Sequence, residues 1–377
     1  MGVVMATSRW LAAYARAARA SDMFLGRPDH ASLIAAGLFG EAGSVLSEVK
    51  KRQREEGAYP SYLDSLGEEL GDCLWYFVRL ADLHAHPLLR ELSRELVRAS
   101  RRPALASALE LGAAVGRVID SVGSHDDTAL RLALADAWKA LERVAGASHT
   151  SLQQAAHANL LKTQGRWPLG SGRPGWPRPS DYHPLFDSRM LREERLPRQL
   201  AVEFIERGSG RKQVILRCND LNVGARINDN ISDPDLYRYH DIFHLSYVVY
   251  LGWSPVTRSL LRCKRKCDPN LDENEDGARA GVIEEAISAV VFSRAKHQHY
   301  FEGATQVDYD LLKNIAELVR GYEVEAVPVW QWERAILEGF RNFRLLRANR
   351  GGHVELSLTE RSLRYRAPGG YKGGRRR

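Results

Sequence analysis

A dense run of prolines and glycines, GRWPLGSGRPGWPRPSDYHPLFD at residues 165–187, divides this 377-residue chain more sharply than any other stretch. Proline removes a backbone hydrogen-bond donor and glycine disfavours regular structure, so no long helix or strand can cross the segment. A chain of this length is also long for a single domain. We therefore expect a domain at 1–164, a linker at 165–190 and a second domain at 191–366.

The two sides of this segment differ in hydrophobic pattern. Up to about residue 162, Ala/Leu-rich runs repeat with helical periodicity and few prolines, which predicts a helical bundle. Beyond the linker, two alternating runs around GSGRK, within residues 199–218, indicate a β-hairpin. Helical patterns and then a strand-like pattern follow, at 233–253, 254–266, 277–301, 308–344 and 353–366. The expected fold is mainly α, with a helical bundle followed by a mainly helical α+β domain that contains the hairpin.

Charge and cysteine content narrow the class of protein. The net charge is +7, but the last fourteen residues hold six basic and no acidic side chains, so the rest of the chain carries only +1. We expect the tail at 367–377 to be disordered, with a nucleic-acid contact as the less favoured alternative. The four cysteines form neither a C-x-x-C motif nor a small disulfide framework. Without a run of eighteen apolar residues or a signal-peptide pattern, we expect a cytoplasmic protein that does not cross a membrane.

Two stretches of the helical half, GLFGEAGSVLSEVKK and EELGDCLWYF, carry acidic residues beside an apolar stripe. At about 100° per residue, Glu41 and Glu48 share one face of the first helix. Glu69 and Asp72 share the corresponding face of the second. If the stripes pack together, the four carboxylates converge, and a hard cation such as Mg²⁺ would relieve their repulsion. The stripes are Leu38, Ala42, Val45, Leu46 and Val49, then Leu66, Leu70, Cys73, Leu74 and Phe77.

The alternative is that these acids are ordinary solvent-exposed side chains, which is their usual state. Against it, Glu69 and Asp72 stand among Cys73, Leu74 and neighbouring aromatic residues, a setting too apolar for a fully exposed helix. The pattern therefore favours a site.

The same two stretches resemble the MazG family of all-α nucleoside triphosphate pyrophosphohydrolases, whose signature is EExxE, a spacer and then ExxD. Position by position, Glu41 matches the second Glu of the first half. Glu69 and Asp72 match the whole of ExxD. The other two acidic positions of the signature are occupied here by Gly40 and Ser44. This chain therefore departs from the family pattern in its first half.

What the resemblance implies is an enzymatic activity and a metal. It implies Mg²⁺-dependent cleavage of nucleoside or deoxynucleoside triphosphates between the α and β phosphates, giving a monophosphate and pyrophosphate, with Mn²⁺ as a substitute ion. We infer that Glu48, one turn beyond Ser44, replaces the missing carboxylate. Glu48 and Glu68 are candidates for the general base. The expected metal-ligating and catalytic residues are Glu41, Glu48, Glu69 and Asp72.

The stretch HANLLKTQGRW resembles the N-x-x-K-x-x-x-R run that ends MazG-like domains and faces the phosphates. The resemblance implies that Asn159, Lys162 and Arg166 bind the phosphates of the substrate. The alternative is a solvated helix end with ordinary basic residues.

A fainter internal similarity indicates a degenerate second copy of the helix pair. Residues 111–120 align with 39–48, and 134–146 align with 70–82, so that Asp136 matches Asp72 while Ala113 stands in place of an acidic residue. MazG-like folds commonly dimerise into helical bundles, so such a copy could supply the partner half internally. We also expect a homo-oligomer. The alternative is two unrelated Ala-rich helices.

A second candidate site lies beyond the linker, in YRYHDIFHLSY. His240 and His244 stand one helical turn apart and can bind one metal ion, with Glu284 of the downstream pair Glu284 and Glu285 completing the set. The alternative is that both histidines are buried packing residues. The pattern HDIFH…VIEEAIS resembles the C-terminal domain, of unknown function, that accompanies a subset of MazG-like proteins.

Two charged segments nearby carry no site in our interpretation. We expect the basic cluster at 264–266 to be a solvated helix end and the acidic run at 268–277 to be a surface turn, because the acids lack the spacing of a calcium loop.

Three functions therefore stay open. The favoured one is a triphosphate pyrophosphohydrolase acting in nucleotide-pool control, alarmone control or antiviral defence by nucleotide depletion. The second is a non-catalytic nucleotide sensor, because Gly40 and Ser44 weaken the motif. The third is a metal-dependent hydrolase or nucleic-acid-processing activity at His240, His244 and Glu284.

Overall fold

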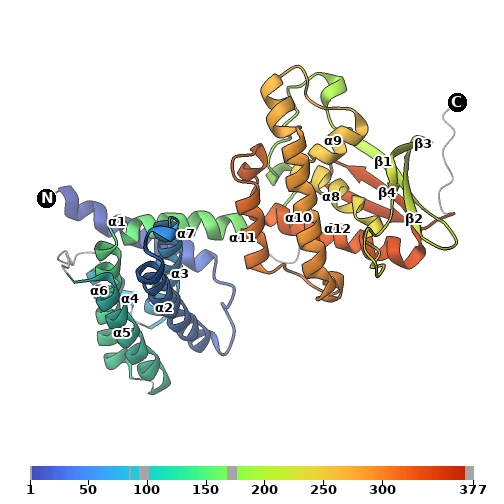
Figure 1. The fold of residues 1–377 in the computed structure, drawn as a ribbon. Coiled ribbons are helices and arrows are strands. Elements are labelled where there is room, and N and C mark those ends of the chain that lie inside the picture. Colours follow the sequence, from blue (N-terminus) through green and yellow to red (C-terminus); the bar gives the residue numbers. More distant parts are fainter. Residues whose placement is uncertain (1, 85, 93–101, 125, 168–175, 370–377) are drawn as a thin grey trace. The chain divides into compact units, whose positions relative to one another are not determined.

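The computed structural model of the chain describes residues 2–84, 86–92, 102–124, 126–167 and 176–369 (Figure 1). The chain divides into two compact units, residues 1–170 and 171–377. The boundary falls within the expected linker, of which residues 168–175 lie outside the described ranges. Most of the expected tail, 370–377, lies outside them as well.

The end of the expected linker is an integral part of the second unit rather than a free connection. Tyr182 and Asp187 are both buried. Asp187 accepts a hydrogen bond from the backbone of Leu196 and forms an ion pair with the buried Arg258, 3.0 Å away. Among residues 176–190 of the expected linker, the regular structure is a single 3₁₀ turn at Pro179–Asp181, and the irregular chain around it packs into the core.

The first unit is helical throughout its described residues, which confirms the predicted bundle. A short 3₁₀ turn follows α2 at Glu56–Ala58. The helices are α1 (Gly2–Ala20), α2 (His30–Glu55), α3 (Tyr62–His84), α4 (His86–Leu92), α5 (Ala104–Ser124), α6 (Asp127–Ala147) and α7 (Leu152–Arg166).

Helices α2 and α3 pack along the predicted apolar stripes. All five stripe residues of α3 are buried, and on α2 only Leu46 is partly exposed. Glycine allows the close approach at one point, because a Cβ on Gly37 would lie 2.2 Å from the ring of Tyr76. Burial of these two stripes is the main source of stability for the pair. The packing fixes which faces of α2 and α3 meet.

Helices α5 and α6, which are similar in length, pack against each other as a second helix pair, and α5 packs on α2 (Figure 1). The side chain of Asp126 caps the start of α6 by accepting hydrogen bonds from the backbone N–H groups of Thr128 and Ala129. The bundle thus contains two neighbouring helix pairs, at the positions that the internal alignment relates to each other.

One described helix, the α2 segment His30–Ala58, is long and apolar enough on composition to cross a membrane. One such helix is weak support for a membrane span, because the core helix of a soluble bundle passes the same test. The buried residues of α2 form a single stripe and Glu41 and Glu48 lie on the same helix, which is the pattern of an amphipathic bundle helix.

The second unit contains one five-stranded antiparallel sheet in its described residues. The predicted hairpin is confirmed by the pairing of Arg207 with Gln213. The terminal segment forms two strands rather than one. The strand after the hairpin was not predicted, because LNVGARI is largely exposed and lacks alternation. The strands are β1 (Gln199–Arg207), β2 (Gln213–Cys218), β3 (Leu221–Ile227), β4 (Gly351–Ser357) and β5 (Ser362–Arg366), in the order β3-β2-β1-β4-β5.

The helices of this unit pack against the sheet around one central helix, α8, whose residues are all buried. Figure 1 shows α8 and α12 beside the sheet, and α12 contacts both α8 and β4. The helices are α8 (Asp241–Leu251), α9 (Pro255–Leu261), α10 (Ala278–Lys296), α11 (Tyr309–Leu318) and α12 (Val329–Asn349).

The helix predictions in this unit were wrong in several bounds: the helix expected at 254–266 ends at Leu261, and the one expected at 277–301 ends at Lys296. The single helix expected at 308–344 is divided into α11 and α12, because Gly321 has a φ of +85° and Pro328 caps the second helix. The helix expected from residue 233 begins only at Asp241. Leu236, in the left-handed region with a φ of +74°, blocks a continuous helix before it.

The two charged segments expected at the surface are partly buried. Arg265 is fully buried and forms ion pairs with Asp276 and Glu323, both with oxygen atoms 2.7 Å from its Nη2. Asp276, from the acidic run, is also buried. Each charge is compensated by the other, so charges that look solvated in sequence form a buried pair in the fold.

Candidate functional site

Packing of α2 on α3 brings three of the predicted carboxylates together. Glu41 of α2 and Glu69 and Asp72 of α3 each offer one oxygen, and these oxygens lie within 4.8 Å of one another. All three side chains are partly buried. Two of the three lie one turn apart on α3, so the cluster needs only the correct face of α2 to complete it.

Burial and, after it, the crowding of like charge raise the pKa values of the carboxylates in this cluster. Burial, and then the neighbouring charges of Glu41, Asp72 and Glu68, raise the pKa of Glu69 to about 7. Burial followed by the charge of Asp72 raises the pKa of Glu41 as well. Without a cation, a proton shared near Glu69 and Glu41 reduces the repulsion. The group is therefore poised to exchange that proton for a metal ion.

Helix α7 contacts the cluster through Asp72, whose two carboxylate oxygens are both engaged. Asn159 donates a hydrogen bond to one oxygen over 2.7 Å, and the ammonium group of Lys162 binds the other. Lys162 also lies 2.9 Å from a carboxylate oxygen of Glu68. Burial raises the pKa of Asp72, although Lys162 opposes that shift. Helix α7 thus fixes the orientation of Asp72 and neutralises part of the negative charge of the site.

The close approach of α7 depends on a glycine of α3. A Cβ on Gly71 would lie 2.8 Å from the backbone oxygen of Ala155 and 2.9 Å from the Cβ of Asn159. Tyr14 of α1, fully buried, donates a hydrogen bond over 2.8 Å to the side-chain oxygen of Asn159. That bond leaves the amide N–H₂ group of Asn159 directed at Asp72.

Two predicted residues have other surroundings. Glu48 lies two turns beyond Glu41, about 10 Å along the helix axis, and accepts a hydrogen bond from the hydroxyl of Tyr59. It lies outside the three-carboxylate cluster, so it does not replace the carboxylate lost at Ser44. Arg166 is the last residue of α7, and its guanidinium lies 5.0 Å from the ring centroid of Trp167.

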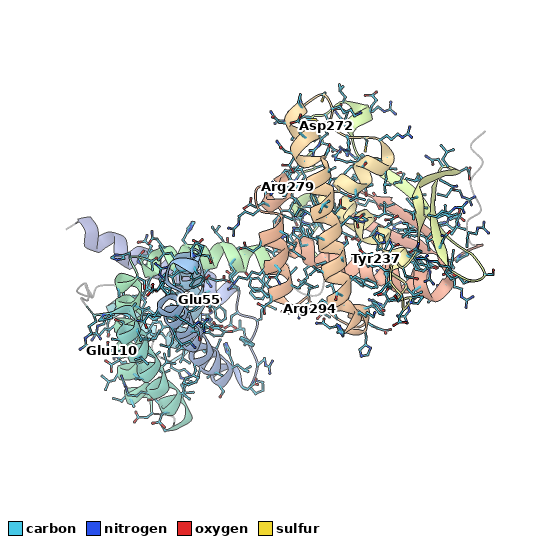
Figure 2. All side chains as sticks on the ribbon, viewed as in Figure 1. Glu55, Glu110, Tyr237, Asp272, Arg279 and Arg294 are labelled. Carbon is cyan, nitrogen blue, oxygen red and sulfur yellow. The ribbon has the colours of Figure 1, made fainter. Side chains whose placement is uncertain are left out.

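The second helix pair, α5 and α6, has a cavity at the position that corresponds to the carboxylate cluster of α2 and α3. It is lined by residues of α5 and α6 that include Ala113, Asp136 and Arg117, and it has a volume of about 270 Å³. Asp136 forms an ion pair with Arg117 over 3.1 Å. Glu110, labelled in Figure 2, pairs with Arg143 over 2.9 Å. The acidic cluster is replaced here by neutralised pairs.

The donor set of the first site fits a hard divalent cation. It offers carboxylate oxygens only, from two helices, and burial followed by neighbouring like charge raises the pKa values of Glu41 and Glu69. Mg²⁺ and Mn²⁺ prefer oxygen ligands of this kind. Lys162 on the rim adds a positive charge that can face a polyphosphate.

The histidines of the second unit also lie together, but with a different carboxylate from the one predicted. His240, His244 and Glu285 each place one donor atom within 4.8 Å of the others. Glu284 is instead fully buried behind the cluster and accepts a hydrogen bond from Nδ1 of His244 over 2.7 Å. Adjacent helix residues point about 100° apart, so only one of the two glutamates can face the histidines' outer nitrogens.

The pKa values of the two histidines shift in opposite directions. Burial would lower the pKa of His244, but the carboxylates of Glu284 and Glu285 outweigh burial and raise it. Burial lowers the pKa of His240, and Asp241 only partly opposes the change. The two rings thus differ in their tendency to hold a proton although they stand one turn apart.

With both clusters described, comparison with known proteins identifies the second unit. A family model described as the MazG C-terminal domain matches residues 181–369, just over half of the chain. The chain belongs to the MazG C-terminal domain family. The match begins at residue 181, next to the buried Tyr182 and within the expected linker. Curated proteins and solved structures gave no match to the chain.

Membership of the MazG C-terminal domain family confirms the resemblance expected for the second half. The match does not extend to residues 1–180, so the first unit is interpreted from its own geometry. Sequence reasoning missed Tyr14, which belongs to no motif. Its only sequence signal is the spacing of Leu11, Tyr14 and Ala18, which all face the core.

Proposed function

We propose that the first unit hydrolyses nucleoside or deoxynucleoside triphosphates to monophosphate and pyrophosphate. The observation that carries this proposal is the convergence of three carboxylates, Glu41, Glu69 and Asp72, beside Lys162 from a third helix. A MazG C-terminal domain in the same chain supports a nucleotide-related role. Nucleotide-pool control and antiviral defence are settings that suit such an activity.

In this proposal Glu41, Glu69 and Asp72 hold Mg²⁺, with Mn²⁺ as a substitute. The bound ion supplies charge neutralisation at the phosphate oxygens. Asn159 keeps Asp72 in a fixed orientation through its 2.7 Å hydrogen bond, and Tyr14 keeps Asn159 fixed in turn. Preorganisation of this kind lowers the reorganisation needed when charge develops on a substrate.

Three further residues have proposed roles in phosphate binding and proton transfer. Lys162, which bridges Glu68 and Asp72, is placed to turn toward a phosphate and release the carboxylate of Glu68. Freed from that ion pair, Glu68 becomes the candidate general base, because Lys162 connects its carboxylate to Asp72 of the cluster. Arg166, four residues after Lys162, extends the positive charge of α7.

Pyrophosphate release by the full chain, measured with a panel of ribonucleotide and deoxyribonucleotide triphosphates in Mg²⁺, tests the proposal. We expect turnover by the wild-type protein, and a loss of at least about 100-fold in Asp72→Ala, because one of the three ligands and the partner of Lys162 are removed together. Circular dichroism should show an unchanged helix content.

The matched control is Asp136→Ala, which removes the aligned carboxylate from the second helix pair, where it is exposed and paired with Arg117. This variant should keep wild-type turnover. Nucleotide binding without turnover in the wild-type protein would contradict hydrolysis and favour the sensor. Turnover retained in Asp72→Ala would place the activity elsewhere in the chain.

A further inference from the structure

The central helix of the second unit carries two histidines where a helix would ordinarily carry apolar side chains. Every residue of α8 is buried, and His244 has only 1% of its side chain exposed. His240, at the N-cap of α8, is also buried. Polar groups buried this deeply need a partner, because loss of hydration is otherwise uncompensated.

Both imidazole rings are fixed through the same nitrogen. Nδ1 of His244 lies 2.7 Å from Glu284, and a carboxylate oxygen can only accept, so Nδ1 is the donor. Nδ1 of His240 lies 2.9 Å from the backbone oxygen of Tyr237, which likewise accepts. The ring of His240 is also stacked on Tyr237, labelled in Figure 2, with centroids 4.3 Å apart.

Glu284 is itself held rigidly. Besides His244, it accepts hydrogen bonds from the hydroxyl of Ser254 over 2.6 Å and from the backbone N–H of Val256 over 2.8 Å. A carboxylate that fixes a histidine from behind is the usual support for a metal-binding imidazole. The arrangement leaves Nε2 of each ring as the outward atom.

The Nε2 atoms of His240 and His244 converge on one point, and they form no hydrogen bond with each other. Nε2 of His244 is buried and has no hydrogen-bond partner among the described residues, although Glu285 lies 3.4 Å away. Nε2 of His240 lies 3.7 Å from Glu285 and 3.6 Å from Asp241. These separations exceed a normal N–H···O hydrogen bond. They are close to the roughly 3.4 Å edge between ligands that each lie about 2.1 Å from a tetrahedral metal ion.

We propose that the second unit binds one divalent transition-metal ion through His240 Nε2, His244 Nε2 and Glu285. Two imidazoles and one carboxylate suit Zn²⁺, Co²⁺, Mn²⁺ or Fe²⁺ and do not suit Mg²⁺, which prefers oxygen ligands. This site is chemically distinct from the all-carboxylate cluster of the first unit.

The site is closed on one side and open on the other. His240, His244 and Asp241 have at most 10% of their side chains exposed, whereas Glu285 is 46% exposed. An ion could therefore enter past Glu285, and a position facing solvent would remain for an exchangeable ligand. Open coordination of this kind is typical of catalytic rather than structural metal sites.

Titration of the metal-stripped full-length protein with Co²⁺ tests the proposal. Co²⁺ bound by nitrogen and oxygen ligands has visible d–d absorption, so binding here has its own optical readout. We expect one equivalent to produce the band and Zn²⁺ to displace it, since Zn²⁺ binds such ligand sets more tightly than Co²⁺. Excess Mg²⁺ should leave the band in place.

Three variants locate the site without relying on a core substitution alone. Glu285→Gln changes a half-exposed side chain, is expected to fold, and should weaken Co²⁺ binding at least tenfold. His244→Gln should abolish the band. Glu284→Gln, in the positioning carboxylate, should reduce affinity by about 10- to 100-fold and alter the band shape. Asp72→Ala, in the other unit, should leave the band unchanged.

The matched control for the histidine substitution is His297→Gln, at the exposed C-cap of α10, which should behave like the wild type. Absence of a Co²⁺ band in the wild-type protein would overturn the proposal and leave His244 as an imidazolium held between two carboxylates. A band insensitive to both Glu285→Gln and His244→Gln would overturn it equally.

Discussion

At the scale of single residues, the raised pKa of Glu69 is caused by the surroundings of its carboxyl group. Its carboxyl group is partly buried and faces Glu41, Asp72 and Glu68, which together raise its pKa to about 7. An ordinary exposed glutamate titrates near 4.3. Glu69 is consequently half protonated near neutral pH when no cation is bound.

We predict that Mg²⁺ binding strengthens as pH rises toward about 7 and then levels off. Below that pH, Glu69 must release its proton before it can bind the ion, which costs up to about tenfold in affinity for each pH unit. Calorimetric titration with Mg²⁺ at pH 6 and pH 8 measures the change. Glu69→Gln should bind weakly at both values. Equal affinity of the wild-type protein at the two pH values would contradict the prediction.

At the scale of secondary-structure elements, the position of α7 on α3 decides whether the site assembles. Gly71 allows the two backbones to approach, because a Cβ there would lie 2.8 Å from the backbone oxygen of Ala155. The approach brings Asn159 and Lys162 to Asp72. A backbone atom cannot rotate away as a side chain can, so the fit tolerates no larger residue.

We predict that Gly71→Ala destabilises the fold by about 1–3 kcal/mol, the usual cost of overpacking, and lowers turnover because Asn159 is displaced. Gly67→Ala, one turn earlier on α3, meets no atom within 4 Å and should instead stabilise the helix by about 0.5–1 kcal/mol. Urea unfolding of both variants separates the two effects. A Gly71→Ala protein as stable as Gly67→Ala would refute the packing argument.

At the scale of the whole molecule, each unit has its own hydrophobic core. One core joins α1 to α7, and the other joins the sheet to the helices of the second unit. The two proposed ions differ in ligand preference, with oxygen ligands in one unit and imidazole in the other. Each ion should therefore stabilise only the unit that binds it.

We predict two thermal transitions in calorimetry of the full chain. Mg²⁺ should raise the midpoint of one transition only, and Zn²⁺ should raise the other, each by up to about 2.7 kcal/mol of stabilisation at a hundredfold excess over Kd. Asp72→Ala should cancel the first shift and Glu285→Gln the second. A single transition that both ions shift equally would contradict independent units.

Several features were predictable because they depend on local pattern. Periodicity placed the stripes of α2 and α3 and the β1–β2 hairpin, and helical spacing put Glu69 beside Asp72 and His240 beside His244. The boundary between the two units, at residues 170 and 171, falls inside the Pro/Gly-rich segment. These properties follow from the chain's own geometry, since neighbours on one helix face are fixed by 3.6 residues per turn.

Other features depend on contacts between distant segments, and only the tertiary structure decided them. The rotation of α10 determined that Glu285 lies at the outer nitrogens of the two histidines, while Glu284 bonds Nδ1 of His244. The distance along α2 excluded Glu48 from the carboxylate cluster. Burial of Arg265 with Asp276 and Glu323 reversed a prediction made from charge alone. The sequence by itself determined which residues share a face of one element. Packing decided which faces of different elements meet. Such contacts depend on small residues such as Gly71 at the points where helices cross, and no local sequence pattern reveals those points.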